Sequence, residues 1–453
     1  MDIIGPILSL IFVVIVARLL LKKYHPHAVL LIAGLSMLTI SLFLGNTLPT
    51  LKDSTGFSGF DFFKFIKESF SRTNAGVGLM IMAIGGFVAY VEKIGASKVL
   101  VHVAMKPLKL FKSKPYIAAS MVIPIGQALF IAIPSAAGLS LLLMASLFPI
   151  LTNLGVSKLS AASVITGTTA FGMGPASAIT ASASSIIDIE VINYFLNHQI
   201  LLMIPLSVSM MVTYYFVNIY FDKKEKHKVE KTEPDTKALD APLIYAIIPV
   251  LPIILLIVFS GLFDLFSTSI KLDTTTAMFI SLFIAMLFEL IRTKSFKKVM
   301  ESMKVFWNGM GNIFKTVVTL IIAADIFAKG LISLGFIDGL LALTQNIGLN
   351  AVGISVVMSV MIFLASMLMG SGNASFFSFG PLVPKISKSL GVDSISMILP
   401  IQFSASMGRT VSPVAGVIIA VSEIAGVSTL QIVKRNLIPL GVAFFIMLTI
   451  HFI

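Results

Sequence analysis

Residues Val352–Leu390 read VGISVVMSVMIFLASMLMGSGNASFFSFGPLVPKISKSL, an apolar stretch with a short polar break in its middle. The break, Gly370-Ser371-Gly372-Asn373-Ala374-Ser375, lacks the Lys, Arg, Trp or Tyr that anchors a turn among lipid headgroups. A second stretch, Pro115–Asn153, breaks similarly at Ile133-Pro134-Ser135-Ala136-Ala137-Gly138. Irregular backbone at membrane depth is tolerated only inside protein or beside a water-filled cavity. We therefore predict two re-entrant hairpins; two ordinary helices joined by a small-residue turn are the alternative.

The composition places the chain in a membrane. Of its 453 residues, 57% are hydrophobic and 12% are charged, with a mean hydropathy of +0.99, whereas soluble domains carry about 25% charged residues. Apolar runs long enough to cross a hydrocarbon core of about 30 Å recur throughout. The predicted full crossings lie near Ile4–Leu21, Ala28–Leu44, Val77–Val91, Ala161–Ile187, Ile200–Tyr220, Pro242–Leu262, Thr276–Ile291, Ile313–Phe327, Ser396–Ile424 and Leu437–Phe452. A water-soluble fold is excluded.

Charge and cysteine content narrow the class further. No small-residue cleavage site follows the first apolar run, so we expect a retained helix rather than a signal peptide. The net charge of +12 comes from Lys and Arg in short loops, which set orientation in the membrane, and no nucleic-acid partner is predicted. The sequence contains no cysteine, which excludes disulfides and thiolate metal ligands.

Short motifs repeat between the two halves of the sequence. The matches are Glu68-Ser69 with Glu301-Ser302, Phe87 with Phe327, Leu154-Gly155-Val156 with Leu390-Gly391-Val392, and Ile204-Pro205-Leu206 with Ile438-Pro439-Leu440. Their order is the same in both halves and their spacing is nearly constant. With five crossings per half, the second copy enters from the opposite face, which is the inverted repeat of secondary transporters.

We therefore predict an all-α polytopic membrane protein with two inverted-topology repeats, each of five transmembrane helices plus one re-entrant hairpin. The repeats are residues 1–221 and 242–453. A charged cytoplasmic linker, residues 222–241, joins them and is interpreted as a solvated tether. Lys and Arg concentrate in the loops of one side, which the positive-inside rule places in the cytoplasm. The expected location is a bacterial inner membrane, with both termini outside the cytoplasm.

Beside each hairpin lies a span that is interrupted at its centre, Thr166–Ser177 in the first half and Ser404–Pro413 in the second. Gly and Pro remove helix hydrogen bonds there and leave carbonyls free before the break and amides free after it. Ser412-Pro413 is a good helix start and Gly174-Pro175 a poorer one. The amide end of a helix carries partial positive charge and suits a carboxylate.

Polar and small residues cluster at the four breaks and form the predicted binding site for a small anion. The candidates are Ser135, Ser140, Thr168, Thr169, Ser177, Ser371, Gly372, Asn373, Ser375, Arg409, Thr410 and Ser412. Close helix packing is the alternative role for any single serine or glycine. No cofactor is predicted, and the metal is left open as a sodium ion near Ser135, Ser371 and Asn373. A coupling proton and a homodimer are also left open.

Two charged residues inside predicted spans stand out. Arg409 lies mid-span, where a cation costs about 2.5–3.5 kcal/mol, and such residues normally face a cavity and a partner. The alternative is that Arg409 only holds the broken helix by bonding its freed carbonyls. Asp325 lies about 15 Å from Lys315 along one helix, too far for direct pairing. We interpret Asp325 as a proton-relay group or as the structural partner of another residue.

Other function classes fit less well. The histidines, His25, His27, His102, His198, His227 and His451, lie near loops, interfaces or the end of the sequence. Neither a serine–histidine dyad nor a zinc motif can be assembled in the membrane core, so an enzyme is not predicted. A channel is the stronger alternative, because broken helices also build selectivity filters.

Four motifs resemble the anaerobic C4-dicarboxylate carriers of the Dcu-C type, within the ion-transporter superfamily. They are GFVAYVEKIGASK (Gly86–Lys98), GLSLLLMASLFP (Gly138–Pro149), GSGNASFFSF (Gly370–Phe379) and GRTVSPVAGVIIAV (Gly408–Val421). The resemblance runs along almost the whole chain. It implies exchange or cation-coupled symport of fumarate, malate and succinate, with elevator-type movement.

The resemblance also implies that the hairpin tips and broken helices hold substrate and coupling cation. The corresponding residues here are Ser135, Ser371–Ser375, Ser177 and Arg409–Ser412. The family tends to show a Thr-Ser-Gly-Asp type stretch after the proline of the first broken helix. This chain has Pro175-Ala176-Ser177-Ala178-Ile179 instead, without the acid. Carriers of other small carboxylates or peptidic acids are therefore the alternative within this class.

Overall fold

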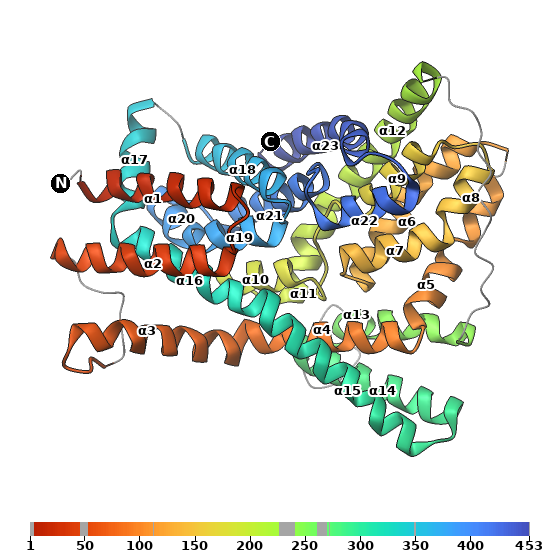
Figure 1. Cartoon of the computed structure of the whole chain (residues 1–453), viewed down its shortest axis with the longest axis horizontal. Helices are drawn as coiled ribbons and strands as arrows, with labels where there is room; N and C mark the ends of the chain where they lie inside the picture. Colours follow the sequence, from red (N-terminus) through yellow and green to blue (C-terminus); the bar gives the residue numbers. More distant parts are fainter. Residues whose placement is uncertain are drawn as a thin grey trace.

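The computed structural model describes residues 4–45, 53–111, 113–225, 241–260, 270, 272–347 and 350–452. Within these ranges the secondary structure is entirely helical. Nine of the described helices are long and apolar enough to cross a membrane, by length and composition. Figure 1 shows two long helices along the lower part of the molecule and a bundle of shorter helices above them. The prediction of an all-helical polytopic membrane protein is confirmed.

Two very long helices form the lower part of the molecule. Each consists of two α-helices joined by a π-helical segment: α3 (Ser58–Thr73), η1 (Asn74–Gly78) and α4 (Leu79–Lys93) in one, and α15 (Phe296–Ile313), η5 (Phe314–Val318) and α16 (Thr319–Ser333) in the other. They cross with their π-segments in contact (Figure 1). Gly76 in η1 has non-helical angles, φ −103° and ψ −114°, which kink the first long helix. π-segments of this kind are typical kink points.

Shorter helices pack around this crossing. They are α1 (Ile4–Leu21), α2 (Pro26–Phe43), α5 (Ala96–Ala104), η2 (Lys106–Phe111), η4 (Leu243–Val250), α13 (Leu251–Val258), α14 (Thr274–Thr293) and α17 (Phe336–Ile347). Small residues allow close approach at the contacts. A Cβ atom on Gly34 of α2 would lie 2.7 Å from the backbone nitrogen of Phe327, and one on Gly330 would lie 2.8 Å from the Gly34 carbonyl oxygen. Such small-residue contacts stabilise helix pairs in membranes.

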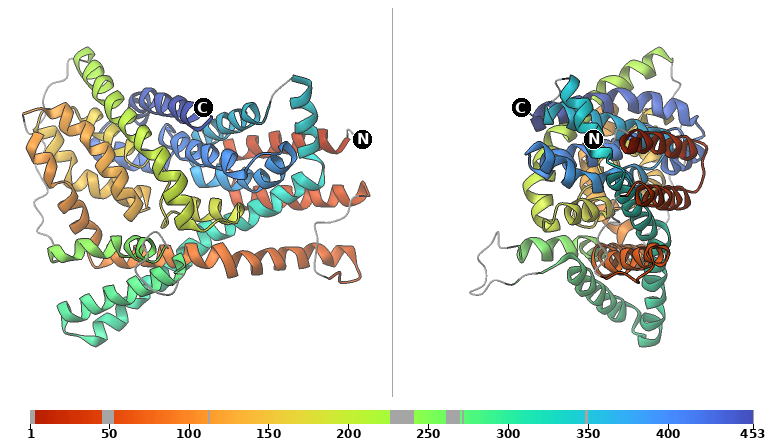
Figure 2. Two further views of the ribbon diagram at one scale, coloured as in Figure 1. Left: turned by 180° about the vertical axis from the view of Figure 1, so that it is seen from behind. Right: turned by 90° about the vertical axis from the view of Figure 1, so that its left-hand side faces the viewer.

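The upper bundle holds the predicted hairpins and broken spans. In the first half it contains α6 (Pro115–Ala132), α7 (Ala136–Ser146), α8 (Phe148–Asn153), α9 (Lys158–Gly167), α10 (Ala178–Ile186), α11 (Val191–Tyr194), η3 (Phe195–Gln199) and α12 (Ile200–Lys224). In the second it contains α18 (Ala351–Met369), α19 (Gly372–Phe379), η6 (Gly380–Leu382), α20 (Val383–Leu390), α21 (Ser394–Thr410), α22 (Gly416–Ala425) and α23 (Thr429–Phe452). Figure 2 shows this bundle above the long helices from two further sides.

The order of helices repeats between the halves. The segment η5 begins 240 residues after η1, α19 begins 236 residues after α7, and α22 begins 238 residues after α10. The predicted match of Phe87 with Phe327 has this spacing. The predicted match of Glu68-Ser69 with Glu301-Ser302 has a spacing of 233 residues, about two helical turns out of register with the helices that contain it.

Contacts between the halves are reciprocal. Helix α2 packs against α16, and the corresponding pair, α14 and α4, also pack together. Helix α1 contacts α17 as η4 contacts α5, and α7 contacts α22 as α19 contacts α10. A two-fold relation between the halves requires this pattern, because each contact then has a counterpart with the roles exchanged.

Several predicted spans differ from the helices in the structure. The broken spans are each two helices, α9 with α10 and α21 with α22, separated by non-helical residues. Helix α12 continues to Lys224, into the predicted linker, of which residues 226–240 lie outside the described part. The arms Pro115–Ala132 and Ala136–Asn153 have 18 residues each, a length of about 27 Å. Their re-entrant depth stays a prediction.

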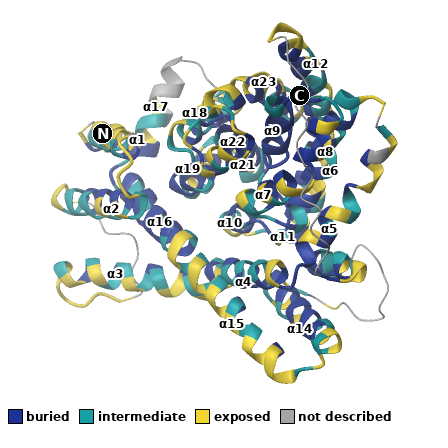
Figure 3. Cartoon of the chain, turned by 45° about the vertical axis from the view of Figure 1, so that its right-hand side comes forward, coloured by how far each residue is buried: buried dark blue, intermediate teal, exposed yellow. Residues whose placement is uncertain are grey.

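Burial is deepest around the broken spans. All ten residues of α9 are buried, and so are most residues of α21 (Figure 3). The helices α3 and α15 instead expose one face, because they carry charged residues among their apolar ones. The polar atoms released at the breaks therefore lie at the centre of the upper bundle.

Candidate functional site

A serine caps the helix that follows each hairpin tip. The Oγ of Ser135 accepts a hydrogen bond from the amide of Gly138 at 3.1 Å, and the Oγ of Ser371 accepts one from the amide of Ala374 at 3.2 Å. Serine at this position satisfies an amide that would otherwise lack a partner. The predicted breaks are thus helix starts, and both hydroxyls already carry one structural bond.

The helices after the broken segments begin later than predicted. Helix α10 starts at Ala178 and α22 at Gly416, three residues after the prolines that we took as first helical positions. Each proline occupies the second position of a turn, closed by Ser177 N to Gly174 O at 3.0 Å and by Ala415 N to Ser412 O at 3.3 Å. Ser412 is therefore not the N-cap of α22.

The four breaks form a continuous chain of contacts. A Cβ atom on Gly174, in the first broken segment, would lie 2.7 Å from Cγ2 of Ile131 in the first hairpin. One on Gly172 would lie 2.6 Å from Oγ of Ser406 in α21. The second hairpin completes the chain, because α19 packs against both α21 and α10. The structure therefore brings the predicted candidate positions into one region.

Arg409 connects the two broken spans. Its Nη2 donates a hydrogen bond to the carbonyl oxygen of Thr169, which follows the end of α9. Its Nε is buried and has no hydrogen-bond partner, and the guanidinium has no acidic partner among the residues that the structure describes. The bond to Thr169 agrees with the alternative in which Arg409 holds a broken helix. The remaining donors are unused and suit an anion.

Most of the other candidate hydroxyls bond to nearby carbonyls. Thr168 donates to Ile165 O at 2.6 Å, Thr169 to Thr166 O at 3.0 Å, Ser375 to Gly372 O at 3.0 Å and Thr410 to Ser406 O at 3.1 Å. A hydroxyl oxygen bonded in this way keeps lone pairs that can accept from a ligand. Gly372 lies against α21, because a Cβ there would be 2.7 Å from Ala405 O.

The remaining candidates differ in burial. The Ser140 hydroxyl is fully buried and has no hydrogen-bond partner within the described residues. Ser177 is buried and precedes α10 without capping it through its side chain, and Asn373 is half-buried behind the second tip.

Sequence reasoning missed a buried network of amides beside the first break. Gln402 of α21 donates to the Gly172 carbonyl at 2.7 Å and accepts from Tyr194 at 2.8 Å and from Gln199 at 3.1 Å. The Gln199 carbonyl oxygen accepts from the Gly174 amide at 3.0 Å. These bonds fix the irregular backbone of the break from two different helices. Two glutamines in otherwise apolar spans were the available signal, since intramembrane polar residues are uncommon.

A second missed residue, Asn436 of α23, joins the ends of both pre-break helices. Its Nδ2 donates to the Thr410 carbonyl and to Thr166 Oγ1, both at 3.0 Å. Its Oδ1 accepts from the hydroxyl of Tyr214 at 3.0 Å. The carbonyl of Thr410, which helix α21 leaves free, is satisfied in this way.

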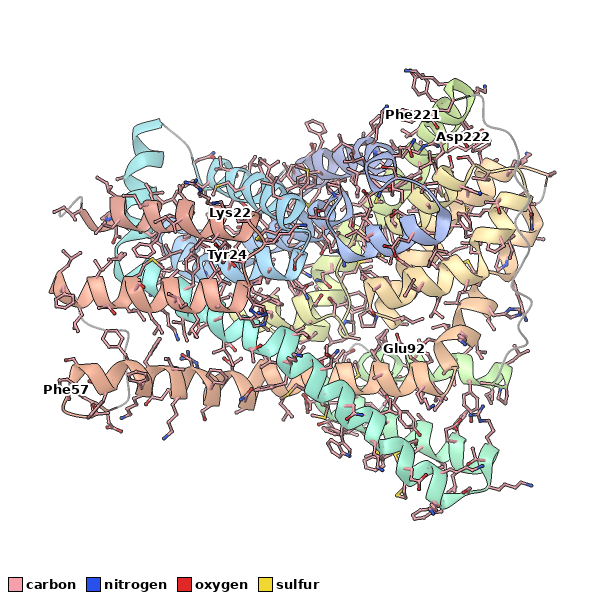
Figure 4. All side chains as sticks on the ribbon, viewed as in Figure 1. Lys22, Tyr24, Phe57, Glu92, Phe221 and Asp222 are labelled. Atoms are coloured by element: carbon pink, nitrogen blue, oxygen red, sulfur yellow. The ribbon has the colours of Figure 1, made fainter. Side chains whose placement is uncertain are left out.

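The predicted linker begins inside the protein rather than in solvent. Asp222, at the end of α12 in Figure 4, is buried and pairs with Arg435 at 2.5 Å. The carboxylate also accepts from Tyr116 at 2.9 Å and from Ser157 at 2.7 Å. Glu225 bonds the other arm of the Arg435 guanidinium at 2.6 Å. The interpretation of Asp222 as part of a solvated tether was wrong, because a partner far away in the sequence compensates its charge.

Asp325 belongs to an ion-pair cluster. Its Oδ2 lies 2.7 Å from the Lys329 ammonium one helical turn away and 3.1 Å from the Arg72 guanidinium of α3. These partners agree with the structural alternative for Asp325. The proton-relay role stays a prediction.

A cavity of about 260 Å³ lies at the first hairpin tip. Its polar lining comes from Glu92 of α4, Ser135 of the tip and Asn312 of α15, and Ala176 and Ala178 border it from the broken segment. A larger cavity of about 430 Å³ between α1 and α18 is lined almost wholly by apolar side chains. It offers no charge compensation to an anion.

Comparison with known proteins decides the family. The family model described as "C4-dicarboxylate anaerobic carrier" matches residues 4–453. The chain belongs to this family. It is 32% identical over 443 residues to the protein named anaerobic C4-dicarboxylate transporter DcuC of Escherichia coli strain K12, covering 98% of this chain and 95% of that protein. It is 33% identical over 438 residues to the probable anaerobic C4-dicarboxylate transporter DcuC of Vibrio cholerae, covering 96% and 94%.

Two solved structures share the fold. The YdaH transporter of Alcanivorax borkumensis superposes with a TM-score of 0.61 at 13% identity, covering 94% of this chain and 98% of that chain. MtrF of Neisseria gonorrhoeae gives a TM-score of 0.57 at 13% identity, covering 94% of each chain. The family prediction from the four sequence motifs is confirmed, and these relatives are named as transporters or efflux pumps rather than as enzymes.

Proposed function

We propose that this protein is a secondary active transporter that carries C4-dicarboxylates such as fumarate, malate and succinate. The observation that carries the proposal is the match of the family model along residues 4–453. The site chemistry supports it. A dianion that loses its hydration needs compensating charge, and Arg409 supplies a guanidinium with unused donors between two broken helices.

The proposed binding site has one strong cation and several dipoles. Arg409 holds one carboxylate by parallel hydrogen bonds, and the amide ends of α19 and α22 receive the other. The hydroxyls of Ser371, Ser375 and Thr410 accept or donate at its edge. Arg409 is only partly buried, so a modest parting of the two broken spans brings substrate to it.

Transport is proposed to follow an elevator-type movement. The upper bundle, with its two hairpins and broken spans, moves against the scaffold of long helices and the helices packed on them. The reciprocal contacts between the halves support two inverted repeats, because inversion gives the site equivalent access paths to both faces. Exchange and cation-coupled symport both fit, in a bacterial inner membrane, with both termini outside the cytoplasm and with a homodimer as the assembly.

Labelled succinate counterflow in proteoliposomes tests the substrate class. Liposomes loaded with unlabelled succinate are expected to accumulate labelled succinate transiently, and fumarate and malate should compete. Protein-free liposomes and a loaded monocarboxylate are the controls. Failure of every four-carbon diacid to exchange would refute the proposal, and a sustained ion leak in its place would favour the channel.

Accessibility of the hairpin tips tests the inverted topology. The sequence has no cysteine, so Ser135→Cys and Ser371→Cys each provide one thiol. Membrane-impermeant reagents should label position 135 from the cytoplasmic face and position 371 from the outer face, because inversion turns the two hairpins in opposite directions. Labelling is measured in right-side-out and inside-out vesicles. Labelling of both positions from one face would contradict the inverted hairpins.

A further inference from the structure

Glu92 has an unusual setting at the cavity beside the first hairpin tip. It lies near the C-terminal end of α4 (Figure 4) and lines the cavity of about 260 Å³. A Cβ atom on Gly138, in the first turn of α7, would lie 2.7 Å from Glu92 Oε1. The carboxylate thus faces the hairpin from the scaffold side. No hydrogen bond or ion pair to Glu92 occurs within the described ranges of the chain.

The second half of the molecule provides an internal comparison. By the spacing of 240 residues between α4 and α16, the counterpart of Glu92 is the apolar Ile332. Helix α16 packs directly against α19, with the rings of Phe327 and Phe379 6.4 Å apart. Its acid, Asp325, is already paired with Lys329. An unpaired carboxylate beside a cavity is therefore a feature of the first half alone among these corresponding helices.

The cavity chemistry selects a cation over the dicarboxylate. A second negative charge beside Glu92 is unfavourable, because like charges repel more strongly at low dielectric than in water. A carboxylate, a serine hydroxyl and an asparagine amide oxygen are hard oxygen ligands. With one carboxylate, the cavity neutralises one positive charge, whereas divalent ions use several carboxylates and more ligands.

No other charged side chain lines this cavity. The charged and titratable groups on the elements packed against α4 are Lys98, His102, Tyr245, Glu289, Arg292, Lys297, Lys298, Glu301, Lys304 and Lys315, and Tyr90, Lys93 and Glu92 belong to α4 itself. Several of them bond elsewhere, since Glu289 pairs with Arg292 and accepts from Tyr245, and Tyr90 bonds Ser302.

We infer that this cavity is the coupling site for a monovalent cation, a proton or an alkali-metal ion, which neutralises Glu92 and is ligated by Ser135 and Asn312. The inference rests on the proposed transport function. Glu92 and Asn312 lie on the scaffold, and Ser135 lies on the hairpin, so the site is complete only when the two parts meet. Bound cation then favours the position in which hairpin and scaffold are in contact, and this links cation movement to substrate movement.

The test measures succinate counterflow by the full chain as a function of cation. One arm varies sodium at constant pH, and the other varies pH in choline salts, with the membrane potential clamped in both. The parent rate should depend on the cation in one arm, which identifies the ion. Glu92→Gln should lose this dependence. Ser135→Ala and Asn312→Ala should raise the half-saturating cation concentration by about 10- to 100-fold, because each loses a ligand to a charge.

Glu68→Gln is the matched control, because Glu68 lies on the same long helix and contacts Lys64 away from the cavity. It should retain the cation dependence of the parent. A cation-induced thermal shift without succinate gives a second readout, expected in the parent and absent in Glu92→Gln. Unchanged cation dependence in Glu92→Gln, or a parent that responds in neither arm, overturns the inference. Should Glu92→Gln fail to fold, an unaltered cation response in both alanine variants overturns it. Loss of succinate exchange in the parent instead refutes the proposed function.

Discussion

Replacement of Asp222 by Ala is expected to lower the free energy of unfolding by about 3–5 kcal/mol, because it leaves the guanidinium of Arg435 buried without its main partner. Both side chains of this pair are 2% exposed. Asp222 also accepts bonds from Tyr116, Ser157 and Ser160. Its loss therefore loosens α12, α9, α6 and α23 together. Unfolding in detergent, followed by the fluorescence of the single tryptophan, Trp307, measures the change.

Two further variants separate the pair from simple loss of packing. Glu225→Ala removes a carboxylate that also bonds Arg435 but is 43% exposed, and it should cost less than about 1 kcal/mol. The double variant Asp222→Leu with Arg435→Met removes both charges and should regain most of the lost stability. Equal losses for Asp222→Ala and Glu225→Ala would contradict the central role of the buried pair.

The breaks in the fold could be predicted from the sequence because their cause is local. Uncharged runs of Gly, Ser and Pro interrupt apolar stretches at Ser135, at Gly370-Ser371 and at the two prolines. Helix termination at such residues depends on neighbours in the chain. The point where each helix resumes was three residues late, since a proline fits the second position of a turn as well as the first position of a helix.

The length of the scaffold helices could not be predicted as readily. Ser58–Thr73 and Phe296–Ile313 carry several charges, so they do not resemble membrane spans, yet they continue the spans α4 and α16 as single long helices. Their apolar residues face one side only. Packing against the crossing partner determines these helices, and sequence hydropathy alone does not contain that partner.

The partners of the polar residues could not be predicted at all. Asp222 and Arg435 are 213 residues apart, and Gln199 and Gln402 are 203 apart. Each pair forms because the two halves interlock. Composition indicated a polar centre in the membrane. It did not show that Gln402 and Asn436 support the breaks, nor that Glu92 stands at a cavity without a partner.

Replacement of Arg409 by Ala is expected to abolish dicarboxylate exchange while the protein still inserts and folds. The guanidinium provides the strongest compensation for a carboxylate in the broken-helix region, and hydroxyls supply no net charge. Arg409→Lys keeps the charge but loses the planar fork that holds a carboxylate by two parallel bonds, so exchange should fall severely. Arg18→Lys, on the exposed face of α1, is the matched control and should exchange as the parent does.

Thermal unfolding with and without succinate separates binding from a purely structural role. At succinate concentrations near 100 times the dissociation constant, the parent should gain about 2.7 kcal/mol of stability. Arg409→Ala should gain far less, because succinate binding depends on the lost guanidinium. The variant should also be less stable without succinate, since the Thr169 carbonyl loses its donor. If succinate stabilises a folded Arg409→Ala protein as much as the parent, Arg409 only holds the two broken spans together, and the substrate carboxylate is bound by the helix amide ends alone.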